Sequence, residues 1–315
     1  MSGTTRSTAL IVLALTIWAA PILAQTRDRG PLVLELASST RAAALGNAFA
    51  LGFRDSDALF YQPGLLNQAQ GQKASFQRFG ANGTLTGLSA ARSWLGGGAA
   101  LGLQHLTYEA PLDPAPTVDD ILLLPADEAT LRDPGTRGAS ETALSIGYGK
   151  TVIGARFGAV GKYVEQRLGT MKASSVALDL GLAASPGPLT VGLAVQNIGP
   201  GLSLGGGEIP LPTRFSLGAS SQTTPVGPLD LSASTALAYR LDGDLIPSVG
   251  VEVGYWPVNG RTFVGRVGYR YLSENFSAVP FTFGGAFWGD DIILEYAFQG
   301  FEEGDPTHRF GIGWR

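Results

Sequence analysis

Residues 249–255 read Val249-Gly250-Val251-Glu252-Val253-Gly254-Tyr255. Large apolar side chains alternate with glycine and a carboxylate, so one face of an extended chain is apolar and the other is small or charged. The same alternation continues in 263–271 and, at the end of the chain, in 308–314. The predicted strands to which these stretches belong run for about 9–12 residues, the length with which a tilted strand crosses a bilayer. We therefore predict membrane-spanning β-strands.

Short turn sequences alternate along the chain with longer connections. Glycine-, proline- or Asp-containing clusters typical of tight turns occur at 96–98, 149–151, 185–188, 225–228, 257–260 and 289–291. The connections between them, such as 109–138 and 199–212, are mostly longer. Tight turns on one side and longer loops on the other are typical of outer-membrane barrels. The pattern predicts a single all-β domain over 71–315, a transmembrane antiparallel barrel of about 14 strands with both ends in the periplasm.

The composition excludes several classes of function. Charged residues make up 15% of the chain, against about 25% in soluble domains. The net charge of −4 lacks the basic footprint of a nucleic-acid-binding protein, so we predict no nucleic-acid partner. The chain has no cysteine and carries no nucleophile, zinc or phosphate-loop motif. We accordingly predict a protein that is not an enzyme, with no catalytic residue, no cofactor and no metal.

Residues 1–24 have the features of a secretory signal peptide. Arg6 precedes an apolar run at 10–20, and Ala24 is a small residue at a cleavage position. The alternative is a membrane-anchor helix, but the wider run 9–24 is shorter than the roughly 20 residues of a span and contains Thr16 and Pro21. We expect export to the periplasm and then insertion into the lipid of the bacterial outer membrane.

Residues 25–70 differ from the rest of the mature chain. The Ala-rich stretch 39–46 begins at a capping serine and ends at a glycine, which predicts a short helix. A second short helix is predicted at 55–61, ended by Pro63 and Gly64. We interpret 25–70 as a helical plug inside the barrel.

Several motifs resemble the PorV/PorQ family, which belongs to the FadL-like group of barrels. Residues 39–49 resemble the family pattern S-x-R-A-x-A-L-G-x-A-F. Residues 55–65 resemble D-x-x-A-x-x-Y-N-P-A-G-L, with Gln62 where asparagine is usual and one residue fewer before Gly64. Asn197, Gly199 and the Pro-Leu-Pro at 210–212 match later family positions, as does the last strand. The resemblance implies a plug motif of Arg41, Leu45, Gly46, Phe49, Asp57, Tyr61, Pro63 and Gly64.

The resemblance implies two functions, of which we expect the first. PorV-like members assist the type IX secretion machinery and bind its translocon or its cargo proteins. FadL-like members pass hydrophobic small molecules through a lumen whose periplasmic end the N-terminal segment plugs. A third interpretation is a structural barrel with a filled lumen.

Charged residues in the polar phase of the strands are predicted to face the lumen, because charges are costly on the lipid face. One interpretation is an internal salt-bridge network; the other is a polar conduit or a site for a substrate carboxylate. The residues are Arg156, Lys162, Asp179, Arg214, Asp230, Glu252, Arg266, Arg270, Glu295 and Arg309.

Two further features stand out. The acidic loop 109–138 contains an apolar run, which either folds over the barrel mouth or docks a partner protein or hydrophobic ligand. That run is Ile121, Leu122, Leu123 and Leu124. The alternation slips near His105, which predicts a bulge in the third strand.

Overall fold

The structure is a computed structural model, and part of the chain lies outside the residues it describes. The predicted signal peptide, Phe49 and the apolar run 121–124 are among those outside. The described residues are 30–48, 55–79, 83–111, 136–204, 207–241, 243, 245–258, 260–271, 278–301 and 306–314.

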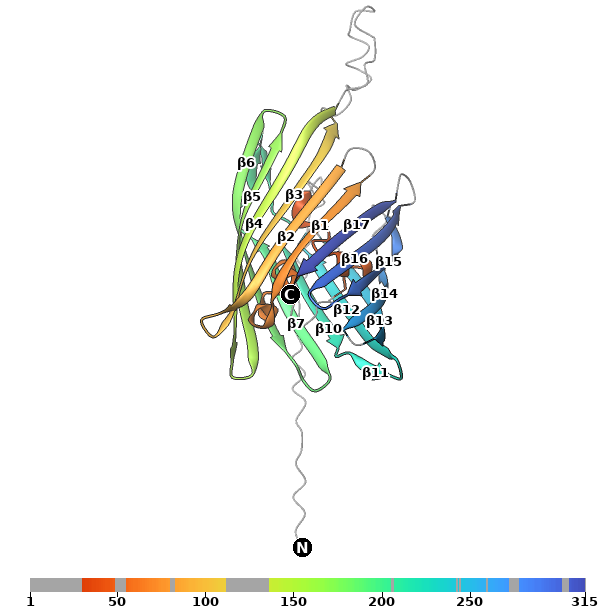
Figure 1. Cartoon of the computed structure of the whole chain (residues 1–315). Helices are drawn as coiled ribbons and strands as arrows, with labels where there is room; N and C mark the ends of the chain where they lie inside the picture. Colours follow the sequence, from red (N-terminus) through yellow and green to blue (C-terminus); the bar gives the residue numbers. More distant parts are fainter. Residues whose placement is uncertain are drawn as a thin grey trace, which may run out of the picture.

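Fourteen strands of the described chain form a closed antiparallel barrel, which confirms the predicted fold (Figure 1). They are β1 (Gly71–Phe79), β2 (Gly83–Trp94), β3 (Gly97–Pro111), β4 (Thr136–Val152), β5 (Ala155–Leu168), β6 (Met171–Ala184), β7 (Leu189–Ile198), β10 (Arg214–Ser221), β12 (Leu229–Arg240), β13 (Leu245–Val258), β14 (Arg261–Arg270), β15 (Ala278–Trp288), β16 (Ile292–Phe301) and β17 (Thr307–Trp314). Each strand pairs with its neighbour in this order, and β17 returns to β1. The short β11 (Thr224–Val226) pairs only with β12, and β8 (Leu202–Leu204) forms a separate hairpin with β9 (Gly207–Ile209).

The two faces of the strands differ as the alternation predicts. Val251 is 50% exposed on the outside of the barrel, whereas the neighbouring Glu252 points inward and is 6% exposed. Leu180 and Asp179 on β6 show the same contrast, at 46% and 0%. The exposed outer face is therefore apolar, and the inner face carries the polar groups. Figure 1 also shows that β3 to β6 form a taller wall than β13 to β16.

Two predictions about the strands are wrong. The turn placed at 149–151 lies further along, at Ile153 and Gly154, and both of these residues have positive φ. The bulge predicted near His105 is absent from the described pairing, because β3 runs in continuous register with β2 and β4. The alternation slips there because the inner face itself becomes apolar: Leu106 faces inward and is 3% exposed.

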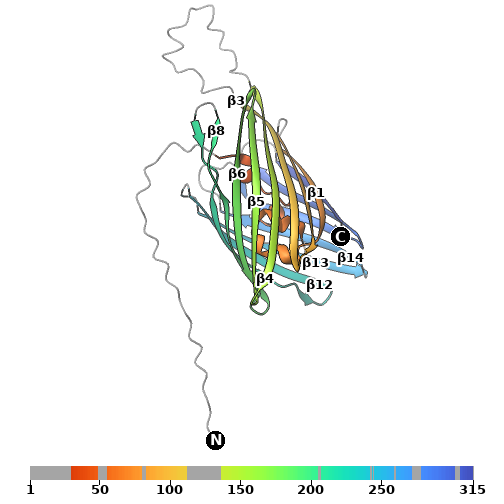
Figure 2. The same cartoon turned by 90° about the vertical axis from the view of Figure 1, so that its left-hand side faces the viewer.

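The described parts of the N-terminal segment lie inside the barrel, between opposite walls (Figure 2). They contain the 3₁₀ turn η1 (Leu32–Leu34), the helix α1 (Thr40–Ala44) and the 3₁₀ turns η2 (Ser56–Phe60) and η3 (Pro63–Gln68). Ser39 caps α1 as predicted, since its side chain accepts from the Ala42 amide. The helix predicted at 55–61 is the 3₁₀ turn η2, which ends before Pro63 as predicted; Pro63 then begins η3, where proline suits the first position. Among the described residues, no helix is long and apolar enough to cross a membrane.

The buried core lies between this segment and the wall. One apolar cluster joins Val33 and Leu34 to Leu85, Leu106 and Val164 of the strands. A second joins η2 and η3 to the opposite end of the same wall, through residues such as Leu59, Leu66 and Val160. Because each cluster needs both the segment and the strands, burial of apolar surface holds the segment in the lumen.

Candidate functional site

Inward-facing glycines let the N-terminal segment lie directly on the barrel wall. A Cβ atom on Gly158 of β5 would fall on the backbone of Pro63 at the start of η3. A Cβ atom on Gly268 of β14 would fall on the backbone of Leu45 and Gly46 after α1. Glycine is the residue that permits so close an approach of two backbones. The segment therefore packs directly against the wall at two places, one on β5 and one on β14.

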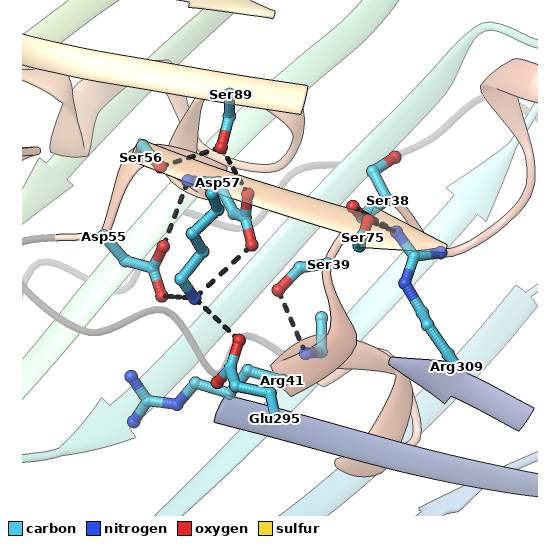
Figure 3. A network of polar contacts seen from close by, with 12 residues as sticks. Ser38, Ser39, Arg41, Asp55, Ser56, Asp57, Ser75, Ser89, Glu295 and Arg309 are labelled. Carbon is cyan, nitrogen blue, oxygen red and sulfur yellow. Dashed lines mark hydrogen bonds and ion pairs between the residues drawn. The ribbon is translucent and has the colours of Figure 1, made fainter. Parts of the chain in front are cut away.

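A buried ammonium group connects the segment to the strands. Lys73 Nζ on β1 lies 2.7 Å from Asp55 Oδ2, 3.5 Å from Asp57 Oδ2 and 3.0 Å from Glu295 Oε2. Figure 3 shows the carboxylates of Asp55, Asp57 and Glu295 converging on one point. Ser89 Oγ donates to Asp57 Oδ1 at 2.7 Å. Burial raises the pKa of the Asp57 carboxyl, and the Lys73 charge opposes that rise.

The ion-pair network continues to the other side of the segment. Arg266 donates to Glu252 at 2.7 Å and to Glu295 at 2.9 Å, so it joins β13 to β16. Arg41 of α1 makes a two-pronged contact with Glu252, at 2.9 and 3.0 Å. This fork geometry is the stronger form of an arginine–carboxylate pair. The predicted salt-bridge network thus includes the segment as well as the wall.

Arg309 and Tyr61 hold the chain between η1 and α1. Arg309 of β17 donates to the carbonyl oxygens of Ala37 and Ser38, at 2.6 and 2.7 Å. The Tyr61 hydroxyl accepts from the amides of Ser38 and Ser39, at 2.8 and 3.1 Å. Burial raises the pKa of Tyr61, so its hydroxyl stays neutral at ordinary pH.

Polar side chains of β3 and β4 bind the beginning of the segment. Glu141, fully buried, accepts from the Val33 amide at 2.7 Å and from the Tyr108 hydroxyl at 2.8 Å. Gln104 donates to the Val33 carbonyl at 3.1 Å. Both backbone groups of Val33 are therefore satisfied by the wall, as buried backbone groups require.

The predicted plug residues inside the described chain all contact the wall or one another. Gly46 donates to Thr282 Oγ1 at 2.9 Å, and a Cβ on Gly181 would meet the Gly64 amide at 2.7 Å. Arg41, Asp57 and Tyr61 make the contacts given above. The structure describes no contact for Phe49, which lies outside its described residues.

The predicted lumen charges lie inside the barrel but do not form one network. Asp179 pairs with Lys162 at 2.6 Å, and Arg156 donates to Gln68 of η3 at 3.1 Å. Asp230 is partly buried. Arg214 meets an amide oxygen, that of Gln196, at 2.6 Å. The Arg270 side chain makes no hydrogen bond or ion pair with the described residues.

Several contact residues were not among the sequence predictions. Lys73, Glu35, Gln104 and Glu141 all bind the segment or belong to it. Lys73 and Gln104 face the lumen from strands whose outward phase also carries polar residues, whereas Glu141 lies in a strand that alternates cleanly over 141–148. A polar side chain in the inward phase of a strand is the sequence signal for such residues. That signal is weak, because the sequence does not show which group the side chain contacts.

Two cavities lie between the segment and the wall. The first has a volume of about 90 Å³, and small residues of β10 and β12 form its wall, among them Gly218, Ala236 and Ala238. The second has a volume of about 160 Å³ and is lined by Leu32, Leu36, Phe79, Phe298 and Phe301. Glu35 and Arg270 line both cavities. By volume the first has room for several waters, or for a small organic group.

Solved structures with a similar barrel include transporters. The chain is similar to the Pseudomonas putida toluene transporter TodX, with a TM-score of 0.56 and 13% identity over 87% of this chain and 96% of that one. The likeness is one of fold. The Ralstonia pickettii toluene transporter TbuX also matches, at TM-score 0.50 and 13% identity over 88% and 97%. A Pseudomonas aeruginosa FadL homologue matches at TM-score 0.50 and 12% identity, over 88% and 97%.

Sequence comparisons add nothing to this likeness: no family model matches the chain, and no curated protein does.

The arrangement is suited to binding and closure. The described lumen combines a segment held by separable polar contacts with two cavities beside it. Small molecules that reach these cavities would meet both apolar and polar walls, which is the usual make-up of a ligand site.

Proposed function

We propose that this protein is an outer-membrane channel for small apolar molecules and that its N-terminal segment closes the lumen. The observation that carries the proposal is the pair of cavities between the segment and the wall, because a purely structural barrel needs no such space. The fold shared with two toluene transporters supports it. The apolar outer face of the strands, such as Ile146 at 64% exposure, fits contact with lipid.

We propose that the protein reaches the outer membrane through the periplasm. The features of residues 1–24 support a cleaved signal peptide and passage through the periplasm. In a barrel inserted there, the predicted orientation puts the tight turns, such as Ile153-Gly154, on the periplasmic side.

Uptake of radiolabelled toluene tests the function. We expect a host strain without hydrocarbon channels to take up toluene faster when it makes this protein. Ala238→Trp puts a large side chain into the first cavity and should remove that gain. Ala233→Trp, on the same strand but facing outward, is the matched control and should keep it. A barrel that gives no gain, or an equal gain in both variants, would refute the proposal.

The PorV-like secretion role stays a prediction. What supports it is the resemblance of residues 39–65 to that family. It predicts that the protein, extracted from its native membranes in mild detergent, is recovered together with a large translocon, and that deleting its gene stops secretion of cargo. Recovery of the barrel alone, with normal secretion in the deletion strain, would dismiss this role.

A further inference from the structure

Two arginines face each other across β10 and β12. Arg214 and Arg240 are paired in register, and like charges in that position repel. Arg240 is compensated by Glu35 of the N-terminal segment, which accepts two hydrogen bonds from it at 2.8 and 3.3 Å. Arg214 is bonded to the Gln196 amide oxygen, which carries no charge. The site is therefore richer in positive than in negative charge.

Arg270 of β14 adds a third guanidinium to this group. It lines the first cavity together with Arg214 and Arg240, and it is near enough to Arg214 for their charges to repel. Its side chain makes no hydrogen bond or ion pair with the described residues. A cation so enclosed is costly unless an anion accompanies it. Arginine presents a planar fork that suits a carboxylate.

The position of Arg270 also indicates the shape of such an anion. It lines both cavities, and the second cavity also has aromatic and aliphatic side chains in its wall. A molecule with its charged group at Arg270 would find room for an apolar body beside Phe79 and Phe301, both in the inward phase of their strands. The volumes of about 90 and 160 Å³ suit a small ring or short chain.

We infer that the lumen binds small organic carboxylates, with the carboxylate on Arg270 and Arg214 and the apolar body in the second cavity. This inference rests on the proposed channel function and adds small amphipathic acids to the apolar molecules that the lumen admits. Glu35 already occupies Arg240, so the segment supplies one carboxylate and the ligand supplies the other.

Calorimetric titration of the full-length protein in non-ionic detergent tests the inference. Benzoate and benzamide have nearly the same shape, but only benzoate is charged at about pH 7.5. We expect benzoate to bind about ten- to a hundredfold more tightly than benzamide. Arg270→Gln should reduce that preference to about threefold or less, whereas Arg261→Gln, at the exposed end of the same strand, should leave it unchanged. Glu35→Gln should tighten benzoate binding, because Arg240 loses its competing carboxylate.

The possible outcomes separate this inference from the proposed function. Equal binding of benzoate and benzamide, or a benzoate preference that survives Arg270→Gln, overturns the inference. Inorganic phosphate binding as tightly as benzoate also overturns it, because the apolar body would then contribute nothing. If the acid preference fails while toluene uptake remains sensitive to Ala238→Trp, the channel function stands. If neither benzoate nor benzamide binds, the inference is wrong. If toluene uptake is also absent, the proposed channel function is refuted too.

Discussion

Lys73 Nζ lies 3.0 Å from Glu295 Oε2, although β17 separates their two strands in the sheet. The side chains meet inside the barrel, beneath the intervening strand. The same ammonium group binds Asp55 of the N-terminal segment at 2.7 Å. Lys73 thus binds both a distant strand and the N-terminal segment. Replacing it is the most direct way to weaken the attachment of the segment to the wall.

Replacing Lys73 by methionine should destabilise the protein strongly. The change leaves the buried carboxylates of Asp55 and Glu295 without this cation, and breaking a buried pair costs about 3–5 kcal/mol. We expect that loss in the free energy of unfolding in urea, followed by tryptophan fluorescence in lipid vesicles. Lys172→Met is the control, because its pair with Glu165 is half exposed and should be worth about 1 kcal/mol or less. Equal losses in the two variants would contradict the role assigned to Lys73.

Gly268→Ala should dislodge the end of α1. The new methyl group would overlap the backbone of Leu45 and Gly46, so the segment must shift. A cysteine at Ala42, which is fully buried, reports the shift by its rate of maleimide labelling in a chain with no cysteine of its own. Gly265→Ala on the same strand has open space at its Cβ and is the control. Labelling as slow in Gly268→Ala as in the control would show that close packing on Gly268 is not needed to hold α1 in place.

Tyr61 should make the protein sensitive to alkali. Burial raises its pKa above the ordinary value of 10.0, so the folded protein keeps the proton when the unfolded chain begins to lose it. The stability contributed by the neutral hydroxyl is present below about pH 10 and falls as the pH rises further. Tyr61→Phe should cost about 1–3 kcal/mol at neutral pH, because two buried amides lose their acceptor.

The measurement for Tyr61 is the free energy of unfolding between about pH 8 and 11. The difference between wild type and Tyr61→Phe should shrink as the pH rises, since the other tyrosines are common to both proteins. A difference that does not change with pH would rule out the raised pKa.

The strands were predictable because their signal is local. In 249–255, each residue's type follows from the face it occupies, and the structure has Val251 outside and Glu252 inside. Where a residue serves a distant contact, the local signal misleads. Gly149 resembles a turn residue, but it lies in β4, where a Cβ atom would meet the Leu66 side chain at 2.9 Å. The actual turn includes Ile153 at a φ of 49°. A β-branched residue rarely adopts positive φ, so the sequence does not predict a turn there.

The partners of the buried charges were not predictable from the sequence. Arg41 and Glu252 are 211 positions apart, and no local pattern connects them. Lys73 was missed because β1 carries polar residues in both phases, so nothing distinguished it. The change in alternation near His105 led to the wrong prediction of a bulge. An apolar inner face and a bulge produce the same sequence pattern, and only the packed segment distinguishes them.

The most direct test of the channel is to lock the segment to the wall and measure toluene uptake. A Cβ atom on Gly311 would lie 3.2 Å from the Thr40 Cβ, slightly short of the roughly 3.5–4.5 Å that a disulfide spans. Thr40→Cys with Gly311→Cys should therefore form a disulfide in the oxidising periplasm. We predict that the oxidised variant takes up no more toluene than cells without the protein, and that a reductant restores uptake in the variant without affecting wild type. Equal uptake before and after reduction, with the disulfide verified, would contradict the proposal that the N-terminal segment closes the lumen and must move when a molecule passes.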